Sequence, residues 1–229
     1  MIYFIIFTKK IMKIIIVGDL HGKSDWESID VDLYDKIVFL GDFTDAFDKT
    51  DQEIIINLQN IIVLKKNNME KVILLFSNHD VQYAFPQDPN KCSGYRPSCA
   101  LILQQIFADN YKLFQMAHLE EDYLFTHAGV STFWWNNFVE RSKYFEYMTA
   151  FNKAQVLNEL VNTGDRWMFN DDQGPLWVRP KTLFDPLHGY HQVVGHTHVK
   201  DFIRVGDNKT SVVYCDVLDT KIDFLILEI

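Results

Sequence analysis

The chain is short of cysteine and proline and contains no long apolar run. It has 3 cysteines and 6 prolines among 229 residues. The cysteines, Cys92, Cys99 and Cys215, are odd in number and lack zinc-knuckle spacing, so neither a disulfide framework nor a structural zinc site is expected. Three cysteines without a pairing pattern are most typical of a reduced cytoplasmic protein, and a loop disulfide between Cys92 and Cys99 is the less favoured alternative.

The apolar run at the N-terminus is too short to span a membrane. Residues 1–7 are apolar or aromatic, whereas a membrane-spanning helix needs ~20 such residues. Lys9 and Lys10 follow this run, which reverses the order of a secretory signal. We therefore expect no membrane partner and treat residues 1–11 as a non-essential extension or an extra strand, with Met12 as an alternative start.

An excess of positive charge is also lacking. The 22 Lys and Arg against 31 Asp and Glu give a net charge of −9, which disfavours long nucleic acids and anionic membranes as partners. A phosphate substrate stays open, because bound divalent cations would make one site locally positive. With 48% hydrophobic residues and no internal repeat, residues 1–229 are expected to form a single domain.

Strand-like and helix-like segments alternate through most of the chain, which predicts an α/β fold. The expected buried strands are Lys13–Val17, Lys36–Leu40, Lys71–Phe76, Tyr123–Thr126 and Gln192–Val194. The expected helices are Asp51–Lys65, Ser98–Asn110, Ser131–Phe138 and Asn152–Asn162. The tail, Lys200–Ile229, is typical of three strands, with a hairpin turn at Asp207–Lys209.

Each of the five buried strands runs into a side chain that can bind a metal ion. Carboxyl ends of parallel strands form the ligand-binding edge of an open α/β sheet, so these side chains are expected to converge. Any one of these short motifs alone is as typical of a turn or a packed histidine, and it is the full set that predicts a dinuclear site. Carboxylate, amide and imidazole groups favour manganese, with iron or zinc as alternatives. The candidate ligands are Asp19, His21, Asp42, Asn78, His127, His196 and His198.

The order of these motifs resembles the calcineurin-like metallophosphoesterase superfamily. The matching elements are Gly-Asp-x-His-Gly, Gly-Asp, Asn-His-Asp, His-Ala-Gly and Gly-His-Thr-His, from about Lys13 to Asp201. The resemblance is closest to the branch of phosphoprotein phosphatases and bacterial symmetrical dinucleoside tetraphosphatases. It implies a four-layered α/β/β/α sandwich that binds two metal ions.

The resemblance also implies individual roles. Asp19, His21 and His198 would bind the first metal ion, and Asp42 would bridge both ions. The second ion would be completed by Asn78, His127 and His196. Outside the ligand set, His79 would be the catalytic acid and Asp45 would orient it.

The substrate-binding groups match the family less well. Members of that branch carry a phosphate-binding arginine where this chain has Ala46. Arg179, which follows Trp177 by two residues, is the implied phosphate ligand, and Arg96 is a candidate replacement for the missing arginine.

We expect a phosphomonoesterase acting on phosphorylated proteins. The alternatives are a hydrolase of dinucleoside polyphosphates or other nucleotides and a non-catalytic scaffold; the sequence does not indicate an oligomeric state.

Overall fold

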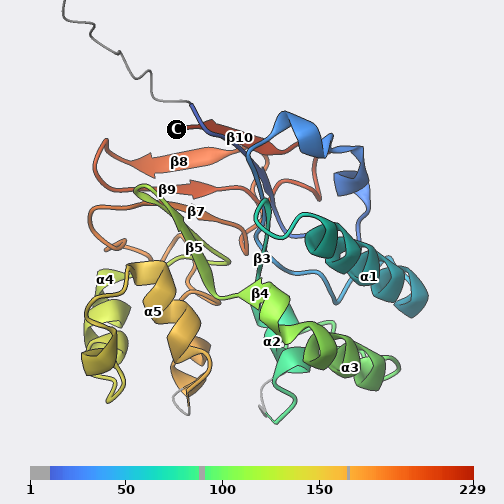
Figure 1. Cartoon of the computed structure of the whole chain (residues 1–229), viewed down its shortest axis with the longest axis horizontal. Helices are drawn as coiled ribbons and strands as arrows, with labels where there is room; N and C mark the ends of the chain where they lie inside the picture. Colours follow the sequence, from blue (N-terminus) through green and yellow to red (C-terminus); the bar gives the residue numbers. More distant parts are fainter. Residues whose placement is uncertain (1–10, 88–90, 164–165) are drawn as a thin grey trace, which may run out of the picture.

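Two five-stranded mixed sheets form the centre of the computed structural model, which describes residues 11–87, 91–163 and 166–229 (Figure 1). Nearly all of the expected N-terminal extension, residues 1–10, lies outside the described residues. The first sheet has the order β10-β1-β2-β3-β4, and the second has the order β5-β6-β7-β9-β8. Their strands are β1 Lys13–Val17, β2 Lys36–Phe39, β3 Val72–Leu75, β4 Phe114–Gln115, β5 Ala117–Glu120, β6 Tyr123–Thr126, β7 His191–Val194, β8 Ile203–Gly206, β9 Ser211–Tyr214 and β10 Leu225–Glu228.

Alternating side chains of the first sheet face two different layers. Ile14 and Ile16 of β1 belong to one buried cluster with Phe125 and Val193 of the second sheet. Ile15, between them, belongs to the cluster that includes the buried faces of the helices. This period of two residues is that of a sheet buried on both faces, and it explains the continuous apolar runs in the sequence.

The helices cover the outer faces of the sheet pair (Figure 1). Helices α1 (Asp51–Asn67), α2 (Asn78–Ala84) and α3 (Ala100–Asn110) lie on one side, and α4 (Thr132–Trp134) and α5 (Lys153–Leu160) lie on the other. Asn158 fixes α5 to the second sheet, because its Oδ1 accepts hydrogen bonds from the N–H groups of Met116 and Ala117 at 2.7 and 2.9 Å. The arrangement is the predicted α/β/β/α sandwich.

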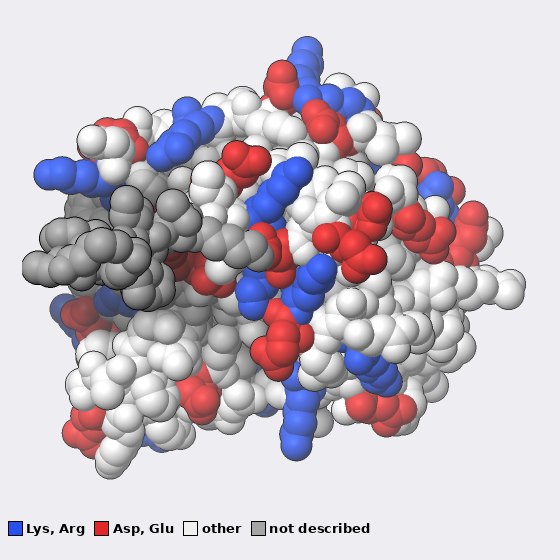
Figure 2. Space-filling view, turned by 45° about the horizontal axis from the view of Figure 1, so that its top comes forward, with Lys and Arg blue, Asp and Glu red and all other residues white. Residues whose placement is uncertain are grey.

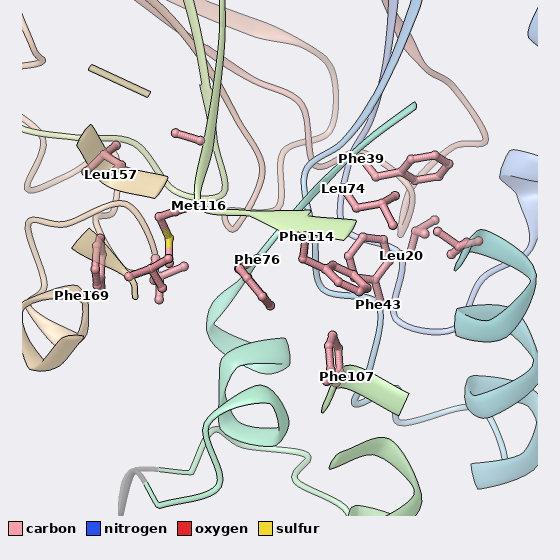
Figure 3. Packing of buried hydrophobic residues seen from close by; sticks show 14 of the residues in the cluster. Leu20, Phe39, Phe43, Leu74, Phe76, Phe107, Phe114, Met116, Leu157 and Phe169 are labelled. Carbon is pink, nitrogen blue, oxygen red and sulfur yellow. The ribbon is translucent and has the colours of Figure 1, made fainter. Parts of the chain in front are cut away.

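An aromatic core joins the helical layers where the chain passes from one sheet to the other (Figure 3). The ring of Phe114 lies 5.7, 5.4 and 5.1 Å, centroid to centroid, from those of Phe43, Phe76 and Phe107. Met116, two residues further along the chain, belongs to the same buried cluster, which continues to Leu157 and Phe169 (Figure 3). This packing positions β3, and therefore the residues that follow it, against the loop after β2.

The predicted elements agree with the structure at most positions. The five buried strands, the three strands of the tail and the turn at Asp207 are present; Asp207 N–H donates to Thr210 O at 2.8 Å. Helix α2 was not expected, and it begins at a candidate ligand, Asn78, with Ser77 as its N-cap. The predicted helix Ser131–Phe138 is present, but only Thr132–Trp134 is α-helical, because the chain continues as a π-helical turn over Trp135–Val139. The adjacent Trp134 and Trp135 are both buried there.

The helices and the distribution of surface charge bear on the partners that the sequence disfavours. Within the described ranges, no helix is long and apolar enough to cross a membrane. On the face shown in Figure 2, acidic and basic side chains are interspersed rather than gathered by sign. That face therefore presents no continuous basic surface to a nucleic acid.

Phe107→Ala should destabilise the fold by about 3–5 kcal/mol, since it removes a fully buried ring from the aromatic core. Urea unfolding followed by circular dichroism measures this change. The matched control on the same helix is Leu101→Ala, whose side chain is 81% exposed and whose loss should cost less than about 0.5 kcal/mol. Equal losses for the two variants would contradict the assigned core.

Candidate metal centre

The residues that follow five strands meet at one edge of the sandwich. Strands β1, β2 and β3 are parallel within the first sheet, and β6 and β7 are parallel within the second. Two hydrogen bonds join the edges of the two sheets: His196 N–H donates to Asp19 Oδ2 at 2.9 Å, and His127 Nδ1 lies 2.9 Å from Leu40 O. The strand ends therefore bring their polar side chains together across both sheets.

Strained backbone is concentrated at this edge. Among the described residues, five other than glycine have a positive φ, and four of them are candidate site residues: His21, Asp42, Asp45 and His196, with φ of 45°, 51°, 62° and 62°. Such conformations cost about 1–3 kcal/mol each and persist where the surroundings impose them. The chain thus holds these side chains in directions that an ordinary strand or helix would not give.

Three histidines at the site each have one ring nitrogen at a backbone carbonyl. His21 Nδ1 lies 3.0 Å from Thr44 O, His127 Nδ1 lies 2.9 Å from Leu40 O, and His196 Nε2 lies 3.2 Å from Trp177 O. Because a carbonyl only accepts, these nitrogens carry the proton, and in the neutral ring the other nitrogen has a free lone pair. Burial lowers the pKa of His127 and brings that of His196 to about 2, which keeps both rings neutral.

The free lone pairs point at one another and at a buried carboxylate. His127 Nε2 is 2.8 Å from Asn78 Oδ1, 3.1 Å from His196 Nδ1 and 3.6 Å from Asp42 Oδ1. Asp42 Oδ2 is 3.3 Å from His21 Nε2, and Asp42 Oδ1 is buried without a hydrogen-bond partner. A cluster of acceptors that lacks a donor is unfavourable unless a cation occupies it.

Asp19, His21 and Asp42 form a tight group that could hold a metal ion, with ligand atoms all within 4.8 Å of one another. Burial raises the pKa of Asp19, and the nearby Asp216 and Asp42 carboxylates raise it further. The site is narrow here, because a Cβ on Gly195 would collide with Asp19 Oδ1. Buried carboxylates that repel one another in this way are the expected ligands of a divalent ion.

The donor set therefore fits two hard or borderline metal ions. Asp19, His21 and Asp42 supply oxygen and nitrogen ligands on one side. Asn78, His127 and His196 supply them on the other, and Asp42 lies between the two groups through its two oxygens. Among the described residues these two groups contain oxygen and nitrogen donors without a cysteine sulfur, and manganese stays a prediction.

A histidine–carboxylate pair lies beside this cluster. His79 Nδ1 is 3.0 Å from Asp45 Oδ2, and the rings of His79 and His21 meet edge to face at 5.2 Å between centroids. Burial alone would lower the pKa of His79, but Asp42 and the hydrogen bond to Asp45 raise it to about 9. These interactions favour the protonated imidazole of His79 at neutral pH.

Three further candidates lie at the margin. His198 is exposed, and its Nε2 is 3.0 Å from Thr220 Oγ1, so its ring does not join the tight group. Arg179 donates from NH1 to His196 O at 2.5 Å, which places its guanidinium beside a candidate ligand.

Arg96 instead donates to Asp51 Oδ1 at 2.5 Å, to Lys49 O at 2.7 Å and to the carbonyl of Ala46. Its guanidinium therefore stabilises the loop from Ala46 to Asp51, and phosphate contact by Arg96 stays a prediction.

Two buried carboxylates of this edge were not singled out from the sequence. Asp80 accepts from Phe43 N–H at 3.1 Å, Thr44 Oγ1 at 3.1 Å and Ser77 Oγ at 2.5 Å, which joins the loop after β2 to the start of α2. Asp216 follows β9 and is 6% exposed. Its position just after a buried strand could have drawn attention to it, because the candidate ligands follow buried strands in the same way.

Mn²⁺ should raise the Tm, and more so at about pH 7.5 than at about pH 5. In the metal-free fold the pKa of Asp19 is raised, so its ionisation destabilises the fold as pH rises, and a bound cation removes that penalty. We expect a gain of about 5–10 °C near neutral pH at saturating metal. Differential scanning fluorimetry measures it, and Asp42→Asn is the control that should show almost no gain. A shift that is the same at both pH values would contradict the ligand role of Asp19.

Comparisons with known proteins agree with this geometry. The family model described as calcineurin-like phosphoesterase matches residues 12–207. The structure is similar to a cold-active protein-tyrosine phosphatase of a psychrophilic Shewanella species, with a TM-score of 0.61, 19% identity, and 96% and 76% of the two chains covered. It is also similar to a metallophosphoesterase from Sphaerobacter thermophilus, with a TM-score of 0.50, 14% identity, and 96% and 84% covered. No curated protein sequence matches significantly. The chain belongs to the calcineurin-like phosphoesterase family, whose members are metal-dependent hydrolases of phosphate esters.

Proposed function

We propose that this chain is a dinuclear phosphomonoesterase of the serine/threonine protein phosphatase type that uses manganese in the cytoplasm. The observation that carries the proposal is the His79–Asp45 pair, which lies beside the cluster of candidate metal ligands without belonging to it. A non-catalytic scaffold would have no use for a protonated imidazole at this place. The cytoplasmic setting is supported by the three cysteines, which are all free in the structure.

The ligand assignment follows the two groups of donors. Asp19, His21 and Asp42 would hold one ion, with His198 joining after a rotation of its exposed ring. Asn78, His127, His196 and Asp42 would hold the other. When bound, the ions supply the positive charge that activates a water molecule for attack and draws electron density from the phosphate.

His79 is proposed to protonate the leaving oxygen. Its Nδ1 is engaged by Asp45, so Nε2 is the nitrogen that can donate a proton to the departing alkoxide. Bound cations would offset the charge of Asp42, and the contact with Asp45 would then be the main interaction that keeps the ring protonated and oriented. The pair thus provides the acid that an alkyl phosphate requires.

Arg179 is proposed as the phosphate-binding side chain. Its NH1 is held by His196 O and by Thr197 Oγ1 at 2.5 and 3.3 Å. In the part of the chain that the structure describes, no other partner engages its remaining N–H groups, which leaves them for phosphate oxygens. Arg96 has protein acceptors for its guanidinium and is the weaker candidate.

A nucleotide substrate is the second candidate, supported by an exposed aromatic ring. Trp167 is 63% exposed in the segment before Arg179 and contacts Phe138 edge to face at 5.8 Å between ring centroids. An exposed indole offers a surface on which a base can stack. An aryl phosphate is a further option to test, because the similar Shewanella protein is named a protein-tyrosine phosphatase.

His79→Asn should lower kcat about 10²–10⁴-fold on an alkyl phosphate while the metal content stays unchanged, because the variant loses only the proton donor. Single-turnover kinetics and elemental analysis of the Mn²⁺-loaded protein measure the two quantities. His188→Asn, at a side chain that is 74% exposed, is the matched control and should behave as the unmodified protein. An unchanged rate for His79→Asn with chemistry rate-limiting would rule out the general-acid role.

A panel of Mn²⁺-supplemented substrates should show the highest kcat/KM for a phosphoserine peptide. The comparison substrates are a phosphotyrosine peptide, p-nitrophenyl phosphate, a bis ester and diadenosine tetraphosphate. Arg179→Ala should raise KM for the peptide about tenfold, since one charge-assisted contact to phosphate is lost. A preference for the dinucleotide would replace the proposed substrate class, and hydrolysis of none of these substrates would refute the proposed activity.

A further inference from the structure

The carboxylate of Asp45 is engaged by more than the histidine it faces. Asp45 is fully buried and its backbone has a φ of 62°. One oxygen, Oδ2, accepts from His79 Nδ1 at 3.0 Å and also from Gln82 Nε2, while Oδ1 accepts from the hydroxyl of Tyr83. All three donors come from α2, at positions i, i+3 and i+4, so one face of this helix surrounds the carboxylate.

The hydroxyl of Tyr83 is constrained to donate. Its Oη accepts the N–H of Arg96 at 2.9 Å, which leaves its own proton for Asp45. Burial and the Asp45 carboxylate raise the pKa of Tyr83 far above its usual value, so the phenol stays protonated. The ring is fully buried and stacks on Tyr95 at 5.1 Å between centroids, which leaves it little freedom to turn.

The amide of Gln82 is fixed in the same way. Its Oε1 accepts the N–H of Cys92 at 2.8 Å, and this contact orients the amide so that Nε2 faces Asp45. Gln82 is 1% exposed, so water does not compete for either group. The backbone N–H groups of Cys92 and Arg96 thus set the orientation of the two side chains that hold Asp45.

We propose that Tyr83 and Gln82 are positioning residues for proton donation by His79, because they hold the Asp45 carboxylate in the orientation that accepts from His79 Nδ1. This inference rests on the proposed general-acid role of His79. A carboxylate held only by His79 could rotate about its Cβ–Cγ bond, and the imidazole would then lose its alignment. With its other sites occupied by Tyr83 and Gln82, Asp45 keeps one direction, and so does the ring that it orients.

The kinetic test is Tyr83→Phe, which removes one hydroxyl, measured on two substrates that differ in leaving group. Phenyl phosphate depends on protonation of its leaving oxygen, whereas p-nitrophenyl phosphate depends on it much less. We expect kcat for phenyl phosphate to fall about tenfold and kcat for p-nitrophenyl phosphate to change less than about twofold, with both KM values unchanged. Gln82→Met, which keeps side-chain length and lacks the amide, should show the same split.

Tyr95→Phe is the matched control, because it removes a phenol oxygen from the same ring stack without touching Asp45. It should leave both rates unchanged. Equal losses on the two substrates for Tyr83→Phe, or no loss on either, would overturn the positioning role. If the unmodified protein hydrolysed no ester, that result would refute the proposed activity but would not test the positioning role. The positioning role would then be tested by a measurement that does not require catalysis.

That measurement is the solvent exchange of the His79 Nδ1 proton in protein labelled with ¹⁵N-histidine. The signal is assigned by its loss in His79→Asn. In Tyr83→Phe the proton should exchange about tenfold faster than in the unmodified protein, whereas Tyr95→Phe should leave the rate unchanged. The same exchange rate in Tyr83→Phe and the unmodified protein would overturn the inference, whatever the substrate.

Discussion

Three imidazole rings each direct one N–H at a backbone carbonyl, and the rest of the site depends on these bonds. The carbonyls of Thr44, Leu40 and Trp177 fix both the tautomer and the direction of His21, His127 and His196. The opposite nitrogens of His21 and His127 then lie 3.3 and 3.6 Å from the oxygens of Asp42, whose Oδ1 is buried without a hydrogen-bond partner. The opposite nitrogen of His196 lies 3.1 Å from that of His127. Buried acceptors that converge in this way raise the free energy of the fold, and a bound cation removes that cost and gains from the prepared geometry.

The fold explains how such an arrangement can be built at all. Two sheets with parallel strands place the ends of five strands at one edge, and each end then turns through strained backbone. Rigid neighbours are needed to hold that strain, and they are supplied by the two packed sheets and by the aromatic core around Phe114. The packed core therefore holds the strained backbone in place, and the backbone fixes the directions of the candidate ligand side chains.

The sequence was informative where local pattern decides the structure. Buried strands show themselves as apolar runs, and the polar residue after each run located six of the seven candidate ligands at the observed cluster. His198 was harder to place, because residues alternate in direction along an extended segment and its ring is exposed. The environment of Arg96 depends on carbonyls from residues 46 and 49, a long-range contact that no periodicity reveals. Helix α2 was missed because its seven residues are too few to show a helical period.

The family motifs contain the candidate metal ligands, whereas the contacts around His79 come from side chains outside those motifs. The loop at Ala46 is held by Arg96, and Asp45 beside it is held by Tyr83 and Gln82. We propose that two cations occupy the converging lone pairs. Anomalous diffraction from crystals grown with Mn²⁺ tests this occupancy most directly. Two peaks are expected, one bounded by Asp19, His21 and Asp42 and one by Asn78, His127 and His196. A single peak, or peaks away from Asp42, would contradict the proposed pair of cations.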